Sequence, residues 1–152
     1  IKYLNQNKFI ETLNISGNNI RNEGFDCICQ GLDKNINLKN LNISNNEIQE
    51  RGIIHSMKLI SSCKLFTLDI SNNLISDNGL IFLTDKILSF TNLQSLNLSY
   101  CNFQFNGFKY LISFFMVLPK SLAFSPPFPI PCIGPPPIGP FLLPLLISKL
   151  LL

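Results

Sequence analysis

The chain of 152 residues has no tryptophan, a single histidine (His55) and no proline before Pro119. It also lacks the common enzyme signatures: a glycine-rich phosphate loop, HExxH and GxSxG. A lone histidine without a positioned acid or nucleophile favours an ordinary residue on a helix surface over a catalytic base. We therefore predict a protein that is not an enzyme and that uses no cofactor or catalytic metal.

Charge is scarce as well, because Asp, Glu, Lys and Arg make up only 14% of the chain. No acidic residue follows Asp85, so the formal net charge of +3 comes largely from Lys120 and Lys149. Residues 1–118 are close to neutral. A near-neutral surface argues against nucleic acid or an anionic membrane as the main partner.

The cysteines do not form the even spacing of a disulfide framework. They are Cys27, Cys29, Cys63, Cys101 and Cys132. Cys27 and Cys29 lack the second pair that a zinc site needs, and residues two apart point to different sides of a helix. We expect buried thiols in an intracellular, cytoplasmic protein.

The chain does have a segment that recurs four times. The copies are IETLNISGNNI from Ile10, LKNLNISNNEI from Leu38, LFTLDISNNLI from Leu65 and LQSLNLSYCNF from Leu93. Self-similarity at a period of 20 to 50 residues is the signature of a solenoid, in which one small unit stacks on copies of itself. The repeat predicts the architecture almost alone.

Each copy has apolar residues at repeat positions one, four, six and eleven, counted from its first residue. Positions four and six alternate with polar neighbours, which predicts a short strand. The 27 or 28 residues before the next strand leave room for a return helix, so the strands should pair in parallel.

Two further positions are nearly constant. Position nine holds Asn18, Asn46, Asn73 and Cys101, and position fifteen holds Gly24, Gly52, Gly79 and Gly107. A side-chain amide has both donors and an acceptor, so stacked asparagines can satisfy the backbone where each strand bends inward. The glycines should let neighbouring repeats approach closely. We assign both positions structural roles.

The pattern LxxLxLxx(N or C)x(I, L or F), followed by glycine four residues later, resembles the leucine-rich repeat in its 28-residue, ribonuclease-inhibitor-like class. The cysteine at position nine of the fourth copy fits that resemblance. The resemblance implies an α/β fold: a right-handed solenoid with a curved parallel β-sheet on its concave face and helices on its convex face. It also implies a role in binding other proteins.

We divide the chain into a repeat domain over residues 1–117 and a proline-rich apolar tail over residues 118–152. Full repeats begin near residues 10, 38, 65 and 93. Leu4 precedes Ile10 by six residues, as Leu32 precedes Leu38, so residues 1–9 resemble the end of a preceding repeat. We interpret the chain as a fragment of a longer solenoid.

The tail has nine prolines and no charge over residues 121–148. Each proline costs about 3 kcal/mol inside a helix, so we expect no spanning helix and no membrane partner. We predict an irregular or disordered segment, with PxxP spacings at Pro126 to Pro129 and Pro137 to Pro140 that are compatible with SH3 or WW docking. Alternatively, the tail could lie over the open end of the solenoid.

Positions two, three, five, seven and eight should face solvent on the strand side. They are mostly Asn, Ser and Thr, and only Phe66 and Tyr100 are aromatic, the class that usually anchors interfaces. Our candidate contacts for a protein partner are Phe66, Tyr100, Lys39, Glu11, Asp69, Asn14, Asn42 and Asn97.

Two other functions stay open. A branch of the resembled family activates small GTPases, which requires charge stabilisation at a phosphate, typically by arginine. The only arginines, Arg21 and Arg51, follow the strand segments, but no recognisable activating motif surrounds them. The chain could also act as a structural spacer in a larger repeat protein.

Overall fold

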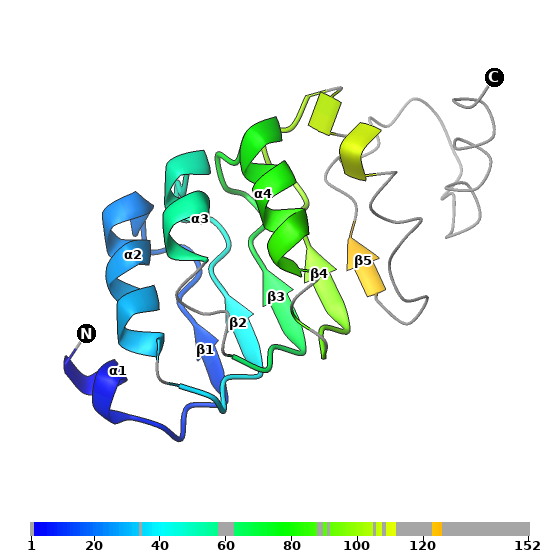
Figure 1. Cartoon of the computed structure of the whole chain (residues 1–152). Coiled ribbons are helices and arrows are strands. Elements are labelled where there is room, and N and C mark those ends of the chain that lie inside the picture. The colour runs from blue at the N-terminus through cyan, green and yellow to red at the C-terminus, as the bar shows by residue number, and fades with distance from the viewer. Residues whose placement is uncertain are drawn as a thin grey trace.

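The computed structural model describes residues 2–33, 35–57, 63–87, 90, 92–104, 106–107, 109–111 and 123–125. Helices and strands alternate from α1 to β4 (Figure 1). The helices are α1 (Lys2–Gln6), α2 (Arg21–Leu32), α3 (Glu50–Ser56) and α4 (Asp77–Ile87). The strands are β1 (Thr12–Asn14), β2 (Asn40–Asn42), β3 (Thr67–Asp69), β4 (Ser95–Asn97) and β5 (Ala123–Ser125).

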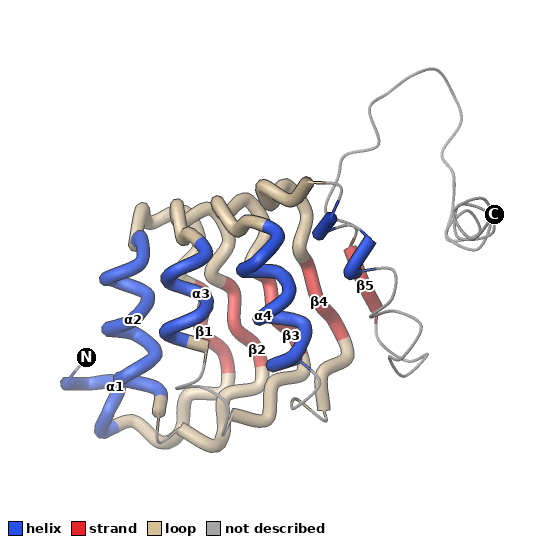
Figure 2. The backbone as a smooth tube through the Cα atoms, turned by 45° about the horizontal axis from the view of Figure 1, so that its top comes forward, coloured by secondary structure: helices blue, strands red, loops and turns tan. Residues whose placement is uncertain are grey.

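The strands form one parallel sheet in the order β1-β2-β3-β4-β5. Equal repeat positions pair with each other, so the position-four residues Leu13, Leu41, Leu68 and Leu96 form one row across the sheet. Helices α2, α3 and α4 lie side by side on one side of this sheet (Figures 1 and 2). The expected α/β solenoid with parallel strands and return helices is confirmed.

The hydrophobic core lies between the sheet and the helices. At position four, Leu41, Leu68 and Leu96 are at most 1% exposed, and the helices contribute side chains such as Phe25 and Leu83. Alternation with period two along the strands and apolar spacing of three to four on the helices bring these residues to one layer. The corresponding apolar residues of the first repeat are only partly buried.

A ladder of asparagine side chains connects the repeats where the strands end. The Nδ2 of Asn46 donates to the carbonyl oxygens of Ile15, Ile43 and Ser44, each at 3.0 Å. Its Oδ1 accepts from the backbone N–H of Asn18 at 3.0 Å. One amide therefore satisfies backbone groups of its own repeat and of the preceding repeat, as buried polar groups require.

The ladder continues through Asn73 and changes at Cys101. Asn73 donates to three carbonyl oxygens at 2.8 to 3.2 Å and accepts from the backbone N–H groups of Asn46 and Ile48. Cys101 keeps the donated bond from its Sγ to the carbonyl oxygen of Ile70 at 3.5 Å, and its sulfur also accepts from the backbone N–H of Asn73. A thiol is a single weak donor, so it can replace only part of what an amide does.

A second series of contacts between repeats, at the start of the helices, was not predicted. The Oδ1 of Asn22 accepts from the backbone N–H of Gln49 at 2.9 Å, and Asp77 accepts equivalently from Gln104 at 2.7 Å. A Cβ on Gly52 would lie 2.5 Å from the Asn22 oxygen. Gly52 and Gly107 therefore leave space for this polar contact, which explains the close approach at these two of the four glycines.

Three residues of the predicted tail are among the described residues. Residues 123–125 form strand β5, which pairs with β4 in parallel, with Leu96 opposite Phe124. Ser95 pairs with Ala123, 28 residues further along the chain, so the spacing of the repeats continues after their consensus has been lost. The sheet is thus extended over its C-terminal end by these three residues. The PxxP spacings and the rest of the tail lie outside the described residues.

At the other end, α1 packs against α2, and the side chain of Leu4 lies close to Gly31. This helix occupies the place of a return helix ahead of β1, as the spacing of Leu4 and Leu32 suggests. Among the described helices, none is both long and apolar enough to cross a bilayer.

We predict that Asn73→Ala lowers the free energy of unfolding by about 3 kcal/mol, because it removes five buried hydrogen bonds and leaves the backbone N–H groups of Asn46 and Ile48 without their acceptor. Asn18→Ala is the matched control: its side chain is exposed, so water replaces the lost bonds, and the cost should be about 1 kcal/mol or less. Urea unfolding of the full chain measures both. Equal losses would show that the ladder does not depend on burial.

Candidate functional site

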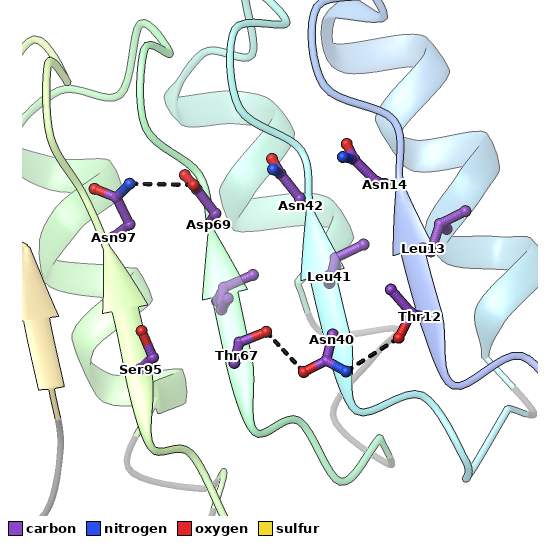
Figure 3. A pocket seen from close by; sticks show the side chains of 11 residues that line it. Thr12, Leu13, Asn14, Asn40, Leu41, Asn42, Thr67, Asp69, Ser95 and Asn97 are labelled. Atoms are coloured by element: carbon purple, nitrogen blue, oxygen red, sulfur yellow. Dashed lines mark hydrogen bonds between the residues drawn. The ribbon is translucent and has the colours of Figure 1, made fainter.

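The strand side of the sheet carries a shallow open hollow with a volume of about 360 Å³ (Figure 3). It extends over β1 to β4, and its polar lining comes from repeat positions three and five. These residues are Thr12, Asn14, Asn40, Asn42, Thr67, Asp69, Ser95 and Asn97. We call this the concave hollow.

The position-five residues, Asn14, Asn42, Asp69 and Asn97, share one local arrangement. In each repeat the Oδ1 accepts from the backbone N–H and from the hydroxyl of the serine two residues later, at 2.6 to 3.1 Å. Asn and Asp side chains commonly bond the backbone two residues on. The motif N/D-x-S therefore holds every position-five side chain in a defined orientation.

The position-three side chains are linked across the strands. Nδ2 of Asn40 donates to Oγ1 of Thr12 at 3.0 Å, and Oγ1 of Thr67 donates to Oδ1 of Asn40 at 2.9 Å (Figure 3). Cross-strand polar pairs of this kind contribute modestly to sheet stability. The hollow thus has an ordered polar lining before any ligand binds.

Asp69 is the only charged residue that lines the hollow among the described residues. Its Oδ2 accepts from Nδ2 of Asn97 at 3.1 Å (Figure 3), and its Oδ1 accepts from the backbone N–H and the hydroxyl of Ser71. All these donors are neutral. The carboxylate is therefore positioned by hydrogen bonds without an opposite charge from the described part of the chain.

The charged pair of candidates lies outside the hollow. Nζ of Lys39 is 2.9 Å from Oε2 of Glu11, with side chains 41% and 59% exposed. Glu11 directly precedes β1, and Lys39 directly precedes β2. An exposed pair of this kind contributes little to stability. Because these two charges are paired with each other, Asp69 is the residue that gives the hollow its charge.

The structure does not bring the two aromatic candidates together. Phe66 directly precedes β3 and is half-buried, with its backbone bonded to Lys39 and to Gln94. Tyr100 lies beyond the end of β4, is 59% exposed and has a positive φ of 56°. They lie at opposite ends of the strands, and neither lines the hollow.

The position-three row was not among the sequence candidates, although it contributes four of the eight polar residues lining the hollow. The signal was present, because side chains two residues apart on a strand share a face. Asn14, Asn42, Asp69 and Asn97 therefore implied Thr12, Asn40, Thr67 and Ser95 beside them.

His55 lies on α3, in the helix layer, and does not line the concave hollow. Its Nε2 is 3.7 Å from Oδ1 of Asp26, and its side chain is 76% exposed. Ser56 also contacts that carboxylate, at 3.4 Å. No cluster of three or more His, Cys, Asp or Glu that could hold a metal ion occurs among the residues that the structure describes.

The two arginines have different surroundings. Nε of Arg21 bonds Oδ1 of Asn19 at 3.3 Å and Oε2 of Glu47 at 3.1 Å, whereas Arg51 is exposed on α3. The ion pair of Arg21 with Glu47 is exposed, with side chains 62% and 56% accessible. GTPase activation through these arginines stays a prediction.

Three of the four described cysteines are buried: Cys29, Cys63 and Cys101. Burial in apolar surroundings raises the pKa of Cys63 to about 11 and that of Cys101 to about 12, and it also raises the pKa of Cys29. Cys27 is half-buried. Cys27 and Cys29, two residues apart, therefore differ in environment.

Comparison with protein families finds the repeat over more than half of the chain. One model, described as "Leucine Rich repeat", matches residues 6–29, 34–54 and 61–83, and a second, described as "Leucine Rich Repeat", matches residues 92–114. A search of curated proteins finds no match.

Among solved structures, the chain is similar to one titled "Leiomodin-1 Actin-Binding Site 2 (ABS2)". The TM-score is 0.71 at 13% sequence identity, and the match covers 99% of this chain and 84% of that chain. Similarity at this low identity shows a shared fold.

We predict that iodoacetamide at pH 8 modifies Cys27 at least about tenfold faster than Cys29, Cys63 or Cys101. The nucleophile is the thiolate, and a raised pKa lowers its fraction at pH 8, while burial blocks access. Peptide mapping by mass spectrometry measures each rate. In urea the four rates should converge, and equal rates in the folded chain would contradict the burial.

Proposed function

Because the chain belongs to the leucine-rich-repeat family, we propose that it is a non-enzymatic module that binds another protein on the concave face of its sheet. The observation that carries this proposal is the concave hollow, whose polar lining is ordered by its own hydrogen bonds. Side chains that are already held lose less conformational entropy on binding. The rest of the strand side is compatible with this use.

The chemistry of the hollow favours recognition over reaction. Its lining consists of amides, hydroxyls and one carboxylate, and it contains no nucleophile paired with a base. Amides and hydroxyls offer both donors and acceptors, which suits the polar surface of a polypeptide. The solved structure of similar fold is named for an actin-binding site, which supports protein binding as a use of this architecture.

The hollow forms the centre of a larger contact. A standard protein interface buries about 800 Å² on each partner. Exposed residues beyond the hollow are available to extend it, including Tyr100 past the end of β4 and the paired Glu11 and Lys39 near the strand starts. We propose that they belong to the rim, where contacts contribute less than at the centre.

We predict that Ser95→Trp weakens binding of the partner at least about tenfold, because the indole fills the hollow. Ser95 is a suitable position, since none of the side-chain hydrogen bonds described here depends on it. The partner is captured from lysate on the immobilised full chain and identified by mass spectrometry. Its affinity for the variants is then measured by surface plasmon resonance.

Arg51→Trp is the control, because it adds the same bulk at an exposed position of α3 on the other side of the sheet. It should leave the affinity unchanged, and thermal unfolding should show that both variants remain folded. A partner that binds Ser95→Trp as tightly as the unmodified chain would exclude the concave hollow as its site.

A further inference from the structure

We propose that the concave hollow takes a segment of the partner that places one cationic side chain, Lys or Arg, against Asp69. This inference rests on the proposed function and adds the chemistry of what is bound. It follows from position five, where the third repeat departs from the other three. Position five is Asn in three repeats and Asp at residue 69.

The serine of each N/D-x-S motif bonds one terminal atom of the position-five side chain and leaves the other available to a ligand. A backbone N–H can only donate, so the atom that accepts from it must be the oxygen Oδ1. In Asn14 and Asn42 the remaining atom is therefore the donor Nδ2, for which the described residues provide no partner. In Asp69 the remaining atom is the acceptor Oδ2, which receives one bond from Asn97.

The row across β1, β2 and β3 thus presents two donors followed by a carboxylate oxygen. Among the described residues, the carboxylate of Asp69 accepts hydrogen bonds from neutral donors only, which belong to Ser71 and Asn97. The charges of Glu11 and Lys39, near the strand starts, are already paired with each other. A carboxylate in such a hollow favours a cation, because charge-assisted hydrogen bonds are about twice as strong as neutral ones.

The two amides add a second requirement. Neighbouring strands lie about 4.8 Å apart, so Nδ2 of Asn42 and of Asn14 lie about one and two strand spacings from the carboxylate. They can donate to acceptors such as the carbonyl oxygens of an extended polypeptide. An anionic ligand such as a phosphate would meet the same two donors but would be repelled by Asp69. The occupant is therefore a polypeptide segment with a single positive charge.

The test uses three libraries of nine-residue peptides on beads, with identical random flanks around a central Arg, citrulline or Glu. Citrulline retains the shape of arginine without its charge. The fluorescently labelled full chain should bind the Arg library about tenfold better than the citrulline library, and the Glu library least. Asp69→Asn should remove the difference between Arg and citrulline.

Asp69→Asn is expected to fold, since Asn is the residue at this position in the other three repeats and can keep both bonds to Ser71. Thermal unfolding and circular dichroism verify this. Asp85→Asn is the matched control, because it makes the same change in charge at an exposed position of α4. It should keep the tenfold preference for Arg.

Three outcomes would overturn the inference. An Arg preference that survives Asp69→Asn would place the cation elsewhere. Equal binding of the Glu and Arg libraries would exclude a role for charge. Light scattering that shows a dimer broken by Asp69→Asn would assign the hollow to a second copy of the chain. In the first two cases, sensitivity of binding to Ser95→Trp would still support the concave hollow as the site, so the two proposals fail separately.

Discussion

The asparagine ladder is the interaction on which the rest of the structure depends. Each strand is only three residues long and must bend towards the helix layer, which turns backbone N–H and C=O groups into a dry interior. Asn46 and Asn73 satisfy those groups in their own repeat and in the preceding one. Because unpaired buried backbone groups are costly, this amide allows such short units to stack at a constant spacing.

The stacking has a direct consequence for the opposite face. Once positions four, six and nine are committed to the core and the ladder, positions three and five are carried into straight rows across the sheet. The serine two residues after each position-five residue then holds its side chain still. Because the repeats are so regular, one repeat with a different residue at position five presents a distinct chemical group in the row. Asp69 has that status, since its carboxylate is held by the same bonds that hold the amides of its neighbours.

The period of 27 or 28 residues allowed the parallel sheet, the register and the core leucines to be predicted, because equal repeat positions must pair. The period did not indicate which candidate contact residues lie together on the surface. Phe66 and Tyr100 were chosen by residue type, and the structure places them at opposite ends of the strands. Strand β5 was not predicted for a different reason. Its residues, Ala123–Ser125, lack the repeat consensus, and their pairing with β4 depends on the sheet edge that the preceding repeats provide.

The repeat unit, its strand and helix, and the repeat positions that face solvent follow from local periodicity and could be derived from the sequence. Which atoms at those positions remain free to bind could be seen only in the folded protein. That choice depends on hydrogen bonds between neighbouring strands and within each N/D-x-S turn, such as those between Asn40 and Thr67 or between Asn97 and Asp69. Directional bonds of this kind require the actual distances between strands, which periodicity alone does not contain.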